Sequence, residues 1–128
     1  MNKKIILTAL VFGFVSIILG AFGAHALKKV MLPDQLASFE VGVKYMMYHA
    51  FFLLFVGNTS FMEMKQKNIV YYLTLFGVVL FSLSIFLLTT SSVIGINFKF
   101  LGPITPFGGL LLILSWGITF YYIGIKKV

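Results

Sequence analysis

The stretch that decides the fold is NIVYYLTLFGVVLFSLSIFLLTTSSVIGINF, residues 68–98, which runs for 31 residues without Asp, Glu, Lys or Arg. Three further stretches of this kind cover residues 5–24, 45–62 and 100–125. A helix that rises about 1.5 Å per residue needs roughly 20 apolar residues to cross a hydrocarbon core of about 30 Å. Each stretch therefore predicts one membrane-spanning helix, and none predicts two.

The composition also indicates a membrane protein, and the 128 residues are enough for a single membrane domain, residues 1–128. Hydrophobic residues make up 60% of the chain and charged residues only 10%, whereas soluble domains carry about 25% charged residues. Segments such as FFLLFV, residues 51–56, do not alternate apolar and polar side chains as barrel strands do. Because only helices and closed barrels satisfy the backbone in lipid, we predict an all-α, polytopic, four-transmembrane-helix bundle.

The expected helices cover about residues 5–27, 35–61, 68–90 and 106–125. Pro33 and Asp34 suit the start of the second helix, since proline is tolerated in a first turn and an acid favours the positive end of the helix dipole. The short connection at residues 62–67 predicts that the second and third helices are antiparallel neighbours. The longest loop is expected at residues 91–105.

The first apolar stretch follows two lysines and ends near Ala24-His25-Ala26, a pattern that also resembles a cleaved signal peptide. The stretch is longer than the apolar region of about 7–15 residues in such peptides, and further spans follow it. We therefore expect a retained first helix.

The net charge of +7 arises from ten lysines and three acids, and most of the lysines flank the apolar stretches. Lysines in such positions mark topology and contact headgroups, so membrane lipids rather than nucleic acid are the expected partners. One side of the membrane is expected to carry Lys3, Lys4, Lys65, Lys67, Lys126 and Lys127. The other side is expected to carry Lys28, Lys29 and Lys99, with Lys44 if its side chain reaches that far. The positive-inside rule then predicts a multi-pass plasma-membrane protein with both termini in the cytoplasm.

Small residues recur on the first helix every three or four positions, at Ala9, Gly13, Ser16, Gly20 and Ala24. Because lipid tails are as apolar as leucine, membrane helices associate through close packing at such residues. The pattern leaves open whether this face packs within one chain or between copies in a homo-oligomer. The candidate positions for helix packing or special backbone geometry are Gly20, Gly23, Ala24, Ser82, Ser84, Thr105, Pro106, Gly108 and Gly109.

Ionisable residues inside a membrane are costly, so they are the first candidates for a functional site. His49 lies well within the second helix and shares a face with Tyr45, one turn earlier. If the first two helices pair antiparallel, His25 comes near the outer half of the second helix, which allows a cluster of His25, Tyr45 and His49. Glu40 and Lys44 have the i, i+4 spacing of an ion pair.

These polar residues also have a purely structural interpretation. His49 can bond a carbonyl or a serine of a neighbouring helix, such as Ser82 or Ser84, and Glu40 with Lys44 can form a weak interfacial pair. Two histidines without a third ligand fall short of a zinc site, and cysteine is absent, so neither a metal nor a cofactor is expected. The residues offer no catalytic set, and we do not predict an enzyme.

The start of the last helix, TPFGG at residues 105–109, is a different kind of candidate. Thr105 is expected to be the N-cap and Pro106 the first helical residue. Free backbone N–H groups beside Gly108 and Gly109 can bind an anion or a lipid headgroup. The alternative is a capped helix that packs tightly against a neighbour, and the capping pattern favours it.

Blocks over nearly the whole chain form a recognisable set: GAFGAHAL at residues 20–27, Phe39 and Tyr45 leading to His49-Ala50, FSLS at residues 81–84, TPFGG at residues 105–109, and Trp116. This set resembles the DUF423 family of small membrane proteins, and GAFGAHAL is its specific block. Leu83 departs from the family pattern, in which a glycine is expected between the two serines. The resemblance implies four membrane helices and an uncharacterised function, and it supplies no catalytic residue.

We therefore expect a non-enzymatic membrane protein with a membrane-structural, lipid-binding or partner-binding role and an unknown small-molecule ligand, if it has one. The alternative is a small oligomeric transporter or channel subunit with His49, His25 and Glu40 on a polar path, which needs an oligomer because one chain of four helices is small. A membrane enzyme that acts on a lipid or a quinone is less favoured, because no carboxylate pair or metal set is evident.

Overall fold

The computed structural model describes residues 2–127, and no strand occurs among them. The long helical segments are α1 (Asn2–His25), α2 (Pro33–Asn58), α3 (Met64–Val78), α4 (Ser84–Ile94) and α5 (Ile104–Gly124). A π-helical segment, η2 (Val79–Leu83), joins α3 to α4, so that one continuous rod runs from Met64 to Ile94. Within residues 2–127, four helices are thus long and apolar enough to cross a membrane, which confirms the predicted all-α, four-transmembrane-helix bundle.

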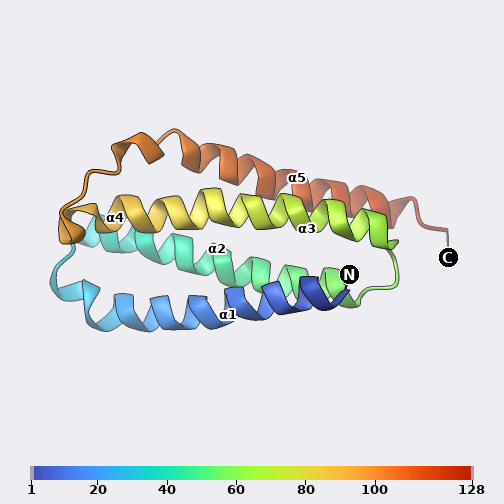
Figure 1. The fold of residues 1–128 in the computed structure, drawn as a ribbon, viewed down its shortest axis with the longest axis horizontal. Helices are drawn as coiled ribbons and strands as arrows, with labels where there is room; N and C mark the ends of the chain where they lie inside the picture. The colour runs from blue at the N-terminus through green and yellow to red at the C-terminus, as the bar shows by residue number, and fades with distance from the viewer. Residues whose placement is uncertain (1, 128) are drawn as a thin grey trace.

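The four rods lie side by side, with α1 and α5 at opposite edges and with α2 and the α3–η2–α4 rod between them (Figure 1). The start of α1, the end of α5 and the connection from α2 to α3 lie at one end of the bundle (Figure 1). The short helical turns η1 (Leu27–Lys29) and η3 (Lys99–Leu101) lie at the other end. This arrangement follows from an even number of crossings, which returns the chain to the side where it began.

All four helical rods begin earlier than predicted, at Asn2, Pro33, Met64 and Ile104, and two of these starts show the physical reason. The third rod begins at Met64 rather than near residue 68, because Glu63 is its N-cap residue and the Glu63 backbone N–H donates to Gln66 Oε1 at 3.0 Å. The last helix begins at Ile104 with Pro103 at the cap position, so the expectation that Thr105 caps it is wrong. The Thr105 hydroxyl instead lies 2.6 Å from the hydroxyl of Ser84, and this contact joins α5 to α4.

The small-residue face of α1 packs within the chain, against α2. A Cβ added at Gly20 would lie 3.5 Å from Val43, and one at Gly23 would lie 3.1 Å from the Phe39 ring. Ala24, which was expected to continue this face, is exposed. The buried position at that end is Gly23, where a side chain would have to displace the ring of Phe39.

The π segment is where α5 approaches most closely. A Cβ at Gly108 would collide with the backbone of Leu80 and Phe81, so α5 and η2 touch backbone to backbone at this point. Single π turns inside α-helices are rare and are frequent at functional sites. The Ser82 hydroxyl, in the same segment, donates to the Gly42 carbonyl at 2.8 Å and so links η2 to α2.

Polar side chains cover the end of the bundle where α1 and α3 begin. Lys67, counted above among the topology-marking lysines, is buried rather than exposed. Its ammonium group donates to Asn2 Oδ1 at 3.3 Å and to the Gly57 carbonyl at 3.5 Å. A cation at the C-terminal end of α2 stabilises the helix dipole there, and the α3 start is thereby tied to both α1 and α2.

Candidate functional site in the cleft between α2 and α5

His49 is the most deeply placed ionisable group of the middle of the bundle, with 3% of its surface exposed. Its Nδ1 lies 2.6 Å from the Tyr45 carbonyl oxygen, one turn earlier on α2. The indole N–H of Trp116, on α5, donates to its Nε2 at 3.0 Å. A carbonyl oxygen can only accept and an indole N–H can only donate, so the imidazole is neutral with its proton on Nδ1.

Aromatic rings surround this hydrogen bond. The Trp116 ring stacks on Phe52 with ring centroids 4.4 Å apart, and the ring of His49 meets Trp116 edge to face at 6.0 Å. Tyr45 packs against Phe81 of the π segment at 5.3 Å. The contacts of His49 and Trp116 therefore bridge α2 and α5, two helices whose main packing partners are α1 and α3.

The bridge stands in a cleft that opens on the surface of the bundle. A hollow of about 480 Å³ on one side of Trp116 reaches Val41 and Gly109, and one of about 540 Å³ on the other side reaches Ile123. Both hollows are lined almost entirely by apolar atoms. Trp116 is 52% exposed and Ile113 is 70% exposed. Because this surface belongs to membrane-spanning segments, the cleft opens sideways into the bilayer.

The structure does not join His25 to Tyr45 and His49. His25 is the last residue of α1 and lies in a shallow surface depression beside Lys28 and Lys29. The chain turns back there and enters α2 at Pro33, and at a rise of about 1.5 Å per residue His49 is about 24 Å further along that helix. The two helices do pair, but the distance between His25 and His49 along the bundle axis prevents a cluster of His25, Tyr45 and His49.

The remaining polar candidates on α2 lie on its outer face. Glu40 and Lys44 are both exposed, and among residues 2–127 no ion pair joins them. Neither Ser82 nor Ser84 bonds His49, because each is engaged elsewhere, with Gly42 and with Thr105 respectively.

The start of α5 is held by contacts within the protein. Pro106 follows Thr105 in the first turn, and Gly108 rests on the backbone of η2. A Cβ at Gly109 would lie 3.6 Å from the Phe81 ring, which is ordinary contact, and Gly109 also lines the cleft. Across residues 2–127 there is no group of three or more metal-ligating side chains that could hold an ion.

Trp116 is the residue of this site that the sequence reasoning missed as a partner of His49. A signal was present, because Trp116 is the single tryptophan of the chain and lies in the middle of its apolar stretch. Tryptophan in membrane proteins gathers at the interfaces, and a buried indole N–H usually finds a hydrogen-bond acceptor. A tryptophan away from the interface therefore indicates a polar partner on another helix.

The model of the family described as "Protein of unknown function (DUF423)" matches residues 19–109. The chain belongs to the DUF423 family. This DUF423 protein is 37% identical over 97 residues to a UPF0382 membrane protein of Staphylococcus saprophyticus, which covers 76% of this chain and 77% of the relative. It is 34% identical over 119 residues to the UPF0382 membrane protein YwdK of Bacillus subtilis, which covers 89% and 90% of the two chains.

A third relative of this DUF423 protein is the UPF0382 inner membrane protein YgdD of Escherichia coli, 29% identical over 120 residues, or 91% of this chain and 86% of the relative. No solved structure matches the chain. The names of the relatives describe membrane proteins and specify no activity. The family match ends at Gly109 and so includes His49 but stops before Trp116.

Proposed function

We propose that this DUF423 protein is a non-enzymatic membrane protein that binds an acyl chain of a bilayer lipid in the cleft between α2 and α5. The observation that carries the proposal is an apolar cleft, open to the membrane, whose central polar group has both of its nitrogens hydrogen-bonded within the protein.

The bonding of His49 supports binding rather than catalysis. A general acid or base needs a proton or a lone pair within reach of its substrate, and a metal ligand needs a free lone pair. Nδ1 of His49 donates to Tyr45 and Nε2 accepts from Trp116, so neither nitrogen is free for such a role. The histidine then holds Trp116 in place and shapes the cleft for an apolar guest.

The transporter alternative has less support from the same contacts. A polar path through His49, His25 and Glu40 requires these groups to lie within reach of one another along the membrane normal. His25 lies at the end of α1, and Glu40 lies on the outer face of α2. We therefore favour a binding role over a conducting one.

The experiment is photo-crosslinking in membranes with a phosphatidylcholine that carries a photoreactive group in its acyl chain. The test variant is Gly109→Leu, because Gly109 lines the hollow beside Trp116 and a leucine would fill it. Gly117→Leu is the matched control, since it makes the same change on the same helix where the space is open.

We expect crosslinks to map to Tyr45, Ile113 and Trp116 in the unaltered protein and in Gly117→Leu. Labelling of these residues should fall at least about twofold in Gly109→Leu, because burial of a competing side chain removes the volume that the guest occupies. Equal labelling of the two variants, or labelling spread evenly around the bundle, would overturn the proposal.

A further inference from the structure

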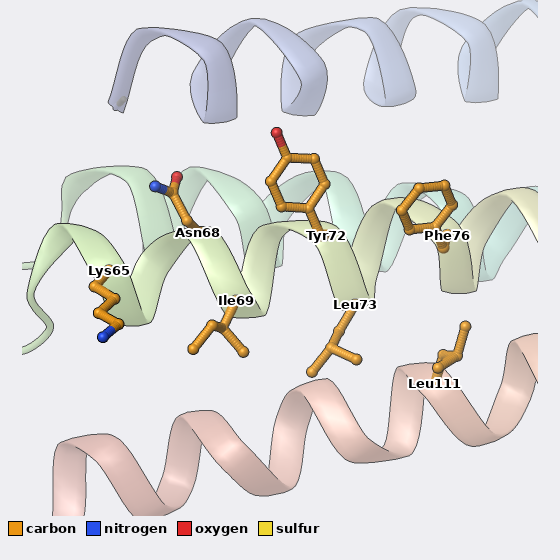
Figure 2. Close-up of a pocket in the computed structure, with 7 residues that line it drawn as sticks. All are labelled: Lys65, Asn68, Ile69, Tyr72, Leu73, Phe76 and Leu111. Atoms are coloured by element: carbon orange, nitrogen blue, oxygen red, sulfur yellow. The ribbon is translucent and has the colours of Figure 1, made fainter.

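A second groove lies on the other side of α5, between α5 and α3, with a volume of about 470 Å³ (Figure 2). One end of it is polar, with Lys65 on the side of α5 and Asn68 on the opposite side of α3 (Figure 2). Apolar side chains follow along its length, with Ile69 and Leu73 directed toward α5 (Figure 2). We propose that this groove binds one anionic phospholipid, with its phosphate at Lys65 and one acyl chain along α3. This inference concerns a site separate from the cleft between α2 and α5.

The length of the groove corresponds to one leaflet. Lys65 lies in the first turn of α3, and the far end of the groove is marked by Phe76 together with Leu111 of α5. From Lys65 to Phe76 the helix rises by about 16 Å, which is close to half of a hydrocarbon core of about 30 Å. A chain that begins at the level of Lys65 therefore ends near the middle of the bilayer. Lys65 therefore lies at the level of the lipid phosphate groups.

The charge at this end of the bundle selects an anionic headgroup. Six lysines gather there, at positions 3, 4, 65, 67, 126 and 127, and Glu63 is the acid near them. Two of these lysines are engaged within the protein: Lys67 with Asn2 and Gly57, and Lys4 with the Tyr72 hydroxyl at 2.8 Å. Lys65 is exposed and lines the groove itself. Basic residues at the membrane surface attract anionic lipids.

Asn68, in the next turn of α3, does not contact such a headgroup. Its Oδ1 is buried and has no hydrogen-bond partner among residues 2–127, and its side chain lies on the side of α3 opposite Lys65 (Figure 2). The charge of Lys65 therefore selects the lipid, and phosphatidylglycerol, whose headgroup carries a net negative charge, is the anionic phospholipid used in the test.

The test is native mass spectrometry of the purified full chain, titrated in detergent with dioleoyl phosphatidylglycerol or with dioleoyl phosphatidylcholine. We expect the unaltered protein to prefer phosphatidylglycerol by about fivefold, the effect of one lysine near a charged surface. Lys65→Gln should abolish most of this preference. Lys126→Gln removes the same charge at the same end but away from the groove, and should keep it.

Further variants separate the groove from the cleft and from surface charge in general. Leu73→Trp fills the groove and should weaken the binding of both lipids, whereas Gly109→Leu fills the cleft and should leave the phosphatidylglycerol preference unchanged. Equal binding of the two lipids by the unaltered protein would overturn the inference. So would an equal loss in Lys65→Gln and Lys126→Gln, or undiminished binding by Leu73→Trp.

Discussion

Two adjacent glycines on α5 provide a sharp test of how closely this helix packs against η2. Gly108 and Gly109 lie in the same turn, but an added methyl group meets different surroundings at each. At Gly108 a Cβ would collide with the backbone of Leu80 and Phe81. At Gly109 it would lie 3.6 Å from the edge of the Phe81 side chain, which is ordinary contact.

The expected energies follow from these contacts. Backbone atoms cannot rotate away as a side chain can, so Gly108→Ala forces α5 away from η2, and overpacking of this kind costs about 1–3 kcal/mol. Gly109→Ala meets no clash, and replacing a helical glycine by alanine is worth about 0.5–1 kcal/mol in favour of the helix. Gly108→Ala gains the same helix contribution, so the two variants should differ in the free energy of unfolding by the overpacking cost alone, about 1–3 kcal/mol.

The assay is reversible unfolding in mixed micelles as the fraction of SDS is increased. Circular dichroism reports the helices, and fluorescence of the single tryptophan, Trp116, reports the cleft. Gly108→Ala should unfold at a lower SDS fraction than the unaltered protein, and Gly109→Ala at the same or a higher one. Equal unfolding free energies for the two variants would refute the backbone contact between α5 and η2.

Three further predictions concern the His49 bridge, the topology and the conducting alternative. Trp116→Phe retains an aromatic ring but leaves Nε2 of the buried His49 without its donor, which should lower the free energy of unfolding by about 1–3 kcal/mol. A double-mutant cycle with His49→Ala, measured by circular dichroism, should show coupling between the two residues, and strictly additive effects would contradict the hydrogen bond. Because the chain has no cysteine, a membrane-impermeant maleimide should label Lys28→Cys in intact cells and Lys126→Cys only after lysis, whereas the reverse pattern would place the termini outside. Liposomes that contain the purified protein should hold a proton gradient as long as empty liposomes do, and a leak that His49→Ala removes would favour a transporter.

The local patterns predicted some features of the site and not others. Tyr45 and His49 share a face because of the helical period alone, and the structure keeps them one turn apart on α2. The predicted cluster with His25 does not form, because the pairing of α1 with α2 does not bring His25 to the level of His49, which lies about 24 Å along α2 from the turn that joins them. Thr105 matched a capping pattern, but its hydroxyl bonds Ser84 on α4, a partner 21 positions away.

The sequence by itself determined that this chain crosses a membrane as four helices, because hydrocarbon admits no unpaired backbone and each apolar stretch has the length of one crossing. Only the tertiary structure decided that Trp116 meets His49, that Gly108 touches the π segment and that Lys67 is buried. The reason is that these contacts depend on the rotation and the axial shift of one helix against another. The rotation and the axial shift are both set by close packing at small residues. All the side chains that face a neighbouring helix determine this packing together, so a local pattern does not predict it.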